Sequence, residues 1–340
     1  MNDKNIQILD CTLRDGSYAI DYKFTADDTA RVCSALEDAG VKLIEIGHGV
    51  GLNGSPKYGI AAATDEEYMK AAGSVLKKSM FGMFCIPGIA RLEDIDLAAK
   101  YKMGFLRVGT NVTEVEQAEP FIKKAKKLGM IVSSNLMKSY ALPVSEVVKK
   151  AKLVRDYGVD NIAIVDSAGG MLPEDVHNYI SELKKKVKGV EIGFHGHNNL
   201  CLAVANTIEA VKAGATVVDT TLQGIGRSVG NAQTEVTAML LEKLGYKTGV
   251  DIIKLMDAGD KIIRPIMDTN KGIDSLSATL GYAQFHSSFL DIVKKVAKEY
   301  NLDPRVLVIE VSKINRILVT EELAKKVAVK INSKKLSNKK

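Results

Sequence analysis

The stretch of sequence that decides the fold is residues 161–196, NIAIVDSAGGMLPEDVHNYISELKKKVKGVEIGFHG. Its β-branched apolar run at 162–165 is typical of a parallel strand that is buried on both faces. An amphipathic stretch at 173–188 begins with proline and stops before Gly189, which are the signals for the two ends of a helix. A second strand-like run follows at 190–194. The stretch therefore predicts one strand–helix unit and the strand of the next.

The same unit recurs along the chain. We predict eight strands, at residues 6–11, 42–47, 79–85, 104–108, 130–136, 161–165, 190–194 and 216–221. Helical patterns lie between them, among them 25–39, 143–157 and 202–213. Eight βα units in roughly 250 residues predict an α/β fold of the (β/α)₈ TIM-barrel type. A doubly wound sheet is the alternative, although no GxGxxG motif follows the first strand.

The strand signal weakens near residue 263, and helical patterns follow at 280–300, 304–315 and 321–329. We therefore predict a TIM-barrel catalytic domain at 1–262 and a helical C-terminal domain at 263–330. A disordered basic tail is expected at 331–340. No Pro- or Ser-rich linker separates the two domains, so the helical domain should pack on the barrel.

Composition excludes several classes of protein. The formal charge of the 340 residues is +6, but residues 321–340 alone carry seven lysines and two glutamates, which leaves the rest near neutrality. A nucleic-acid-binding face is therefore not supported. Apolar runs are too short for a membrane span, and residues 2–5 are polar and lead into a strand, so we expect a cytoplasmic protein. The four cysteines form no CxxC pair, which indicates reduced thiols.

Metal-ligating residues gather where barrel strands end. His195 and His197 are two residues apart on an extended segment, so both imidazoles point to the same side. Asp15 follows the first strand, beside Arg14. A carboxylate and two imidazoles suit Mn²⁺, Mg²⁺, Fe²⁺ or Co²⁺, and zinc stays open. Such an ion, with Arg14, would stabilise the enolate of a 2-oxo acid.

Other polar residues at predicted strand ends give weaker signals. Glu45, His48, Asn135 and Ser167 could orient ligands or merely satisfy loop backbone. The glycine-rich stretch at 224–231 could approach an anion or form a tight turn.

Several motifs in this order together resemble the DRE-TIM metallolyase superfamily. They are DCTLRDG at 10–16, HxH at 195–197 and GNA at 230–232. Further likeness, to the 4-hydroxy-2-oxovalerate aldolases, lies in GHGxGL at 47–52, DSxG at 166–169, IRP at 263–265, LGYA at 280–283 and SSFL at 287–290. The resemblance covers nearly the whole chain, including the predicted helical domain.

The resemblance implies a class II pyruvate aldolase, a lyase that cleaves a 4-hydroxy-2-oxo acid to pyruvate and an aldehyde. By the same resemblance Asp15, His195 and His197 are the metal ligands, and the metal is Mn²⁺, with Mg²⁺ or Co²⁺ as alternatives. Arg14 would stabilise the enolate, and Arg14, Asp15, Ser167 and His195 would contact substrate. An oligomer and an acylating aldehyde dehydrogenase as partner are further implications.

Two positions depart from the family pattern. The family has a catalytic His where this chain has Tyr18, and a Tyr where this chain has His286. An unperturbed Tyr titrates near ~10 and a His near ~6.5, so we predict that His286 is the base and that Tyr18 orients the substrate hydroxyl. A Claisen-type condensing enzyme that joins an acyl-CoA to a 2-oxo acid, and a non-catalytic partner subunit, are the alternative functions.

Overall fold

The computed structural model describes residues 5–55, 57–267 and 275–337, with only the backbone for 334–337. Its eight parallel strands form a closed barrel in sequence order, so the predicted TIM barrel is confirmed. The strands are β1 Gln7–Asp10, β2 Leu43–Ile46, β3 Met80–Cys85, β4 Phe105–Asn111, β5 Ile131–Met137, β6 Asn161–Asp166, β7 Glu191–Gly196 and β8 Val217–Thr220. Ile8 pairs with Val218 and thereby closes the barrel.

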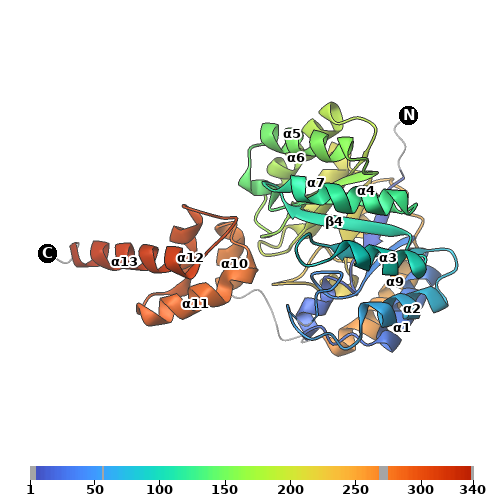
Figure 1. Cartoon of the computed structure of the whole chain (residues 1–340), viewed down its shortest axis with the longest axis horizontal. Coiled ribbons are helices and arrows are strands. Elements are labelled where there is room, and N and C mark those ends of the chain that lie inside the picture. Colours follow the sequence, from blue (N-terminus) through green and yellow to red (C-terminus); the bar gives the residue numbers. More distant parts are fainter. Residues whose placement is uncertain (1–4, 56, 268–274, 338–340) are drawn as a thin grey trace.

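Helices surround the barrel and alternate with its strands (Figure 1). They are α1 Ala26–Asp38, α2 Asp65–Val75, α3 Leu92–Lys100, α4 Glu119–Lys127, α5 Val144–Asp156, α6 Pro173–Lys186, α7 Ala203–Ala213, α8 Thr234–Lys243 and α9 Ile252–Ala258. Thr25 illustrates why a helix begins where it does, because its side chain and that of Asp28 cap each other's backbone amides. A large hydrophobic core packs the strands against these helices, and Leu9, Cys11, Phe105 and Val217 form a separate, smaller cluster. Within the described residues, no helix has the length and apolar composition needed to cross a bilayer.

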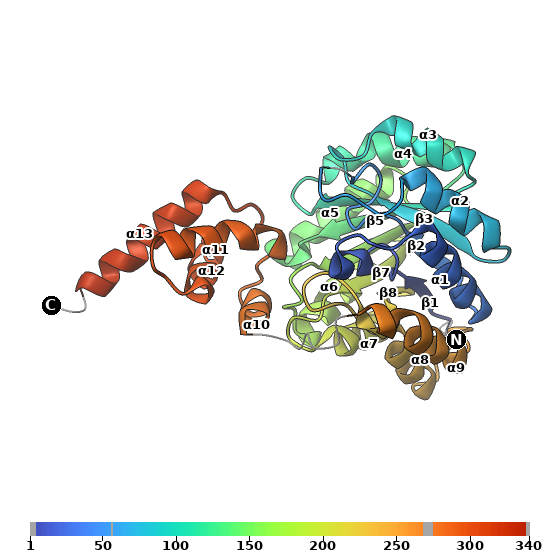
Figure 2. The same ribbon diagram turned by 90° about the horizontal axis from the view of Figure 1, so that it is seen from below.

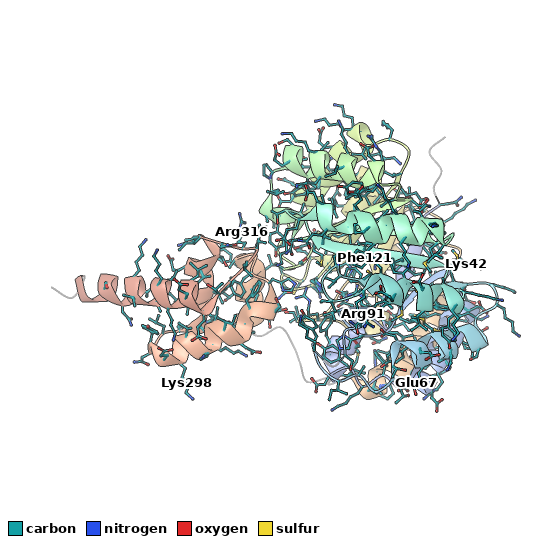
Figure 3. The ribbon with its side chains drawn as sticks, viewed as in Figure 1. Lys42, Glu67, Arg91, Phe121, Lys298 and Arg316 are labelled. Carbon is teal, nitrogen blue, oxygen red and sulfur yellow. The ribbon has the colours of Figure 1, made fainter. Side chains whose placement is uncertain are left out.

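The C-terminal helical segment, residues 275–337, consists of α10 Ser275–Tyr282, α11 Leu290–Glu299, α12 Pro304–Ser312 and α13 Glu321–Ser337. It has a hydrophobic core of its own. In both ribbon views α10 lies beside the barrel, whereas α13 extends away from it (Figures 1 and 2). Figure 3 shows Arg316 at the junction with the barrel and Lys298 pointing outward from α11.

The helical segment packs on the barrel, as predicted. The Lys138 ammonium at the end of β5 donates to the Ile317 carbonyl at 2.6 Å, and the Asn199 amide donates to the Ser277 carbonyl at 3.0 Å. The backbones also approach closely, since a Cβ built on Gly170 would lie 2.1 Å from the Gly281 carbonyl oxygen. The junction therefore requires glycine at position 170.

The prediction of one helix over 280–300 is wrong. Gln284 adopts a left-handed φ of 51°, His286 is extended, and the chain makes a short 3₁₀ turn, η7 Ser287–Phe289, before α11 begins. The imidazole Nδ1 of His286 caps this turn by accepting the Ser288 backbone N–H at 3.2 Å. The break turns His286 and its neighbours toward the barrel mouth.

Two further boundaries concern the limits of the domains. Ile263 packs in the barrel core, and the division between a barrel at 1–262 and a helical domain from 263 stays our proposal. α13 continues to Ser337, so most of the predicted tail at 331–340 extends a helix instead of being disordered. Residues 338–340 lie outside the described residues.

Candidate active site

A cavity of about 440 Å³ opens where the barrel strands end. In a TIM barrel this is the face that carries active sites. Loops after most of the strands line it, and the η7 turn of the helical segment covers one side with His286, Ser287 and Ser288. The helical segment thus contributes directly to the pocket instead of serving only as a support.

Three buried residues meet on one wall of this cavity. Asp15 follows β1, whereas His195 and His197 lie at the end of β7, and one potential ligand atom from each falls within 4.8 Å of the other two. The distance from His195 Nε2 to Asp15 Oδ2 is 3.8 Å. We call these residues the metal trio.

Hydrogen bonds orient both imidazoles of the trio. His195 Nδ1 lies 2.9 Å from the Asp219 carboxylate, and His197 Nδ1 lies 3.3 Å from the Gly230 carbonyl oxygen. Both partners accept, so each Nδ1 carries a proton and each Nε2 keeps a lone pair. A carboxylate or carbonyl behind a histidine is the usual arrangement around a metal ligand.

The charge state of the trio also suits a cation. Burial would raise the pKa of Asp15, but the Arg14 guanidinium beside it holds that pKa well below its ordinary value. The Asp15 Oδ1 accepts hydrogen bonds of 3.0 Å from the Arg227 backbone N–H and the Asn231 amide. Burial and the Arg227 guanidinium keep the pKa of His197 well below its ordinary value, so this ring is neutral and able to ligate.

A second group of potential ligands, Cys11, His195 and Asp219, does not suit a metal. Burial raises the pKa of the Cys11 thiol well above its ordinary value, whereas a thiolate is needed to ligate. Asp219 is already ion-paired with Arg107. The metal trio is therefore the better candidate, and its mixed nitrogen and oxygen donors fit a divalent ion such as Mn²⁺ or Mg²⁺.

A buried ion-pair network supports the trio from below. Arg14 donates to Asp15 at 2.5 Å and to Glu45 at 2.7 Å, and Arg107 bridges Glu45 at 3.0 Å to Asp219. Burial opposes ionisation of Asp219, yet Arg107 and His195 lower its pKa. The chain of contacts fixes Arg14 and His195 relative to one another.

Tyr18 and His286, the two departures from the family pattern, face the same cavity from opposite chain segments. Burial raises the pKa of the Tyr18 hydroxyl far above its ordinary value, so it stays protonated. Burial, followed by Arg227 and Lys138, lowers the pKa of His286 well below its ordinary value. A Cβ built on Gly49 would lie 2.6 Å from the Tyr18 ring, so glycine at 49 is what lets this ring reach the pocket.

The weaker sequence signals divide into two groups. Ser167 and Asn135 line the cavity, and the Ser167 hydroxyl accepts the Lys138 backbone N–H at 3.0 Å. His48 does not face the cavity: its ring bonds the Gly59 carbonyl at 3.0 Å and stacks on Tyr22 at 4.0 Å between centroids, which holds the loop after β2.

Sequence reasoning missed four charged residues of the site. Arg107 and Asp219 lie within β4 and β8, where a charged residue in a buried strand was an available signal. Lys138 directly follows β5, and Arg227 lies in the glycine-rich stretch, where only the glycines indicated a function. The Arg227 guanidinium donates to the Ser167 carbonyl at 2.9 Å and contacts His197 Nε2 at 2.7 Å.

Comparison with known structures agrees with this fold. The carboxyl transferase domain of Rhizobium etli pyruvate carboxylase, solved with pyruvate, has a TM-score of 0.80 at 16% identity over 98% of this chain and 62% of that one. HMG-CoA lyase of Bacillus subtilis has a TM-score of 0.68 at 20% identity over 78% of this chain and 96% of that one. At such identities the likeness establishes the fold alone.

Sequence comparison is more specific. Residues 5–262 match the HMGL-like family. A 4-hydroxy-2-oxovalerate aldolase of Carboxydothermus hydrogenoformans is 42% identical over 97% of this chain and 98% of its own length. One of Moorella thermoacetica is 43% identical over 99% of this chain and 100% of its own length. This chain therefore belongs to the HMGL-like family and, within it, groups with the 4-hydroxy-2-oxovalerate aldolases.

Proposed function

We propose that this protein is a divalent-metal-dependent aldolase that cleaves, or forms, a 4-hydroxy-2-oxo acid from pyruvate and an aldehyde. The observation that carries the proposal is the convergence of Asp15, His195 and His197 beside Arg14 at the barrel mouth. Full-length likeness to lyases of this activity supports it. Mn²⁺ is our choice of ion, with Mg²⁺ or Co²⁺ as alternatives, because the donor set contains no thiolate.

When bound at the trio, a divalent ion supplies Lewis-acid polarisation of the keto group. The chain's own residues do the rest. Arg14 is held by Asp15 and Glu45 next to the trio, so its guanidinium places a fixed positive charge where the keto oxygen becomes negative. Because the network is formed in advance, this stabilisation needs no rearrangement during the reaction.

Proton transfer at the 4-hydroxyl is assigned to His286. A Tyr18 with a raised pKa cannot accept a proton near neutral pH, but it can donate a hydrogen bond and orient the hydroxyl. His286 is neutral there because its pKa is lowered. Its Nδ1 also lies 2.7 Å from the Ser288 hydroxyl, which can accept a hydrogen bond. In the tautomer protonated at Nδ1 the ring gives up its bond from the Ser288 backbone N–H, and Nε2 is free to take the substrate proton.

Deuterium exchange tests the proposed reaction without its aldehyde. Pyruvate in D₂O with Mn²⁺ and the protein should exchange its methyl protons, followed by NMR, and Arg14→Lys should exchange far less because a point charge does not replace the planar fork. Absence of exchange with Mn²⁺, Mg²⁺ and Co²⁺ alike would refute the proposal. Self-association, a partner aldehyde dehydrogenase and a cytoplasmic location stay predictions.

A further inference from the structure

We infer that the acceptor aldehyde carries an anionic group, and that Lys138 and Arg227 bind it on the side of the pocket covered by the helical segment. The inference rests on the proposed function and narrows its substrate class. The shared chemistry is a carboxylate or a phosphate, at the end of the aldehyde remote from its reacting carbonyl carbon. Lys138 and Arg227 are called the cation pair below.

Both members of the cation pair line the same cavity as the trio and His286. They flank Ser167, since the Lys138 backbone donates to its hydroxyl at 3.0 Å and the Arg227 guanidinium donates to its carbonyl at 2.9 Å. Arg227 also reaches Ser287 in the η7 turn. The pair therefore occupies the wall between β6 and the helical segment.

Neither the Lys138 ammonium nor the Arg227 guanidinium forms a salt bridge with a carboxylate among the described residues. The contacts of Arg227 are a carbonyl, a serine hydroxyl and the imidazole of His197, and Lys138 donates to the Ile317 carbonyl at 2.6 Å. Lys138 is only 7% exposed, and its ammonium lies 5.1 Å from the Phe289 ring centroid. A buried charge without a counter-charge is costly, so a site that keeps one is suited to an incoming anion. Burial and Arg227 lower the pKa of Lys138 to about 8, which an anion would reverse.

The charges on the metal side show that the carboxylate of pyruvate alone does not neutralise the cation pair. Arg14 and Arg107 face the three carboxylates of Asp15, Glu45 and Asp219, which leaves one negative charge. Asp15, His195 and His197 would hold a divalent ion, which would make the sum one positive charge, and the carboxylate of pyruvate would cancel it. The cation pair thus remains after the 2-oxo acid has been neutralised, and a second anionic group on the other reactant would match it.

The shape of the pocket leaves room for such a group. A cavity of about 440 Å³ is in the range that holds drug-sized ligands, so it can accept an aldehyde longer than acetaldehyde. The wall formed by the loops after β2 and β3 carries the apolar side chains of Val50, Phe84, Ile86 and Ile89. Arg14 lies over the Phe84 ring at 4.8 Å but is already ion-paired with Asp15 and Glu45, so an anionic end would point to the cation pair.

The test compares matched aldehydes in the condensation with pyruvate, in which the pyruvate methyl carbon bonds the aldehyde carbon and the methyl proton ends on the new hydroxyl. Succinic semialdehyde is measured against butanal, and glyceraldehyde 3-phosphate against glyceraldehyde. A charge-assisted hydrogen bond predicts a preference in kcat/KM of roughly 10- to 100-fold for the anionic member of one pair. The pair that shows it identifies carboxylate or phosphate, and equal rates in both pairs overturn the inference.

Variants assign the preference to the cation pair. Lys138→Met and Arg227→Met should each remove most of the preference, whereas Lys138→Arg should keep it. Lys149→Met, which removes an exposed cation on α5, serves as the matched control and should leave the ratio unchanged. If Arg227→Met abolishes deuterium exchange of pyruvate itself, Arg227 serves the 2-oxo acid and the assignment is wrong.

A binding measurement separates recognition from turnover. 2-Oxoadipate differs from 2-oxohexanoate by a carboxylate in place of a terminal methyl group. It should therefore raise the melting temperature of the wild type more than 2-oxohexanoate does, whereas the two acids should raise that of Lys138→Met equally. If Lys138→Met instead lowers the melting temperature of the free protein and keeps the aldehyde preference, Lys138 only ties the barrel to Ile317.

Exchange of pyruvate protons without any aldehyde preference would refute this inference alone, whereas absent exchange would refute the proposed function.

Discussion

The two sides of the pocket are built in different ways. On the metal side, charges are compensated: Arg14 and Arg107 alternate with the carboxylates of Asp15, Glu45 and Asp219. On the helical side, the Lys138 ammonium and the Arg227 guanidinium contact only neutral groups among the described residues, and His286 comes from a turn that interrupts a helix. The compensated network of the metal side is suited to holding the groups of one chemical step in place. The helical side has unpaired charges and a departure from the family pattern at His286, as expected of the side that selects the substrate.

Loss of a metal ligand should have the largest effect, because it removes the chemistry of the metal side altogether. In His195→Ala we expect metal affinity to fall by more than the roughly 10- to 100-fold that is typical of residues behind a ligand. Metal analysis after dialysis, together with pyruvate exchange, measures it. Equal metal content in the mutant and the wild type would show that the trio is not the site.

On the helical side, His286→Ala should reduce kcat by roughly 10²- to 10⁴-fold, the range for loss of a general base. Its lowered pKa also sets the pH dependence of the wild type. The base must be neutral, so activity should fall only as the pH drops through a value below the ordinary 6.5 of histidine. A steady-state pH profile of both proteins measures this, and a wild-type rate in the mutant would leave His286 as a packing residue.

The two sides also differ in how far the sequence alone could predict them. The metal trio lies at the ends of β1 and β7, so the strand pattern and the HxH spacing were enough to bring it together. Asp219 and Arg107 could have been suspected from charges within buried strands. His286 could not be placed without a resemblance, because apolar periodicity continued through 280–300 and concealed the break at Gln284. Lys138 and Arg227 depend on how the helical segment docks, which local patterns do not determine.

The support behind the trio can be weakened without removing a ligand. Asp219→Asn keeps the shape but loses the charge that fixes the His195 tautomer and pairs with Arg107. We expect metal affinity or activity to drop by roughly 10- to 100-fold. Isothermal titration with Mn²⁺ measures the affinity, and Asp257→Asn, on the exposed face of α9, is the control. An unchanged affinity would mean that the network stabilises the barrel without tuning the ligand.

The smallest effect is expected at Tyr18, where the two sides meet. Its hydroxyl is held protonated, so its contribution is a single hydrogen bond to the substrate, and Tyr18→Phe should cost roughly 2- to 10-fold in kcat/KM.

The double change Tyr18→His with His286→Tyr sharpens the comparison, because it restores the family arrangement across the cavity and should retain activity if both positions face one substrate. If Tyr18→Phe abolishes turnover while His286→Ala leaves it near the wild-type rate, Tyr18 rather than His286 transfers the proton, and the assignment to the helical segment is wrong. If both single changes are severe and the double change stays inactive, the two groups act as a pair whose geometry the exchange cannot reproduce. Measuring the four proteins with one aldehyde at saturating pyruvate decides between these outcomes.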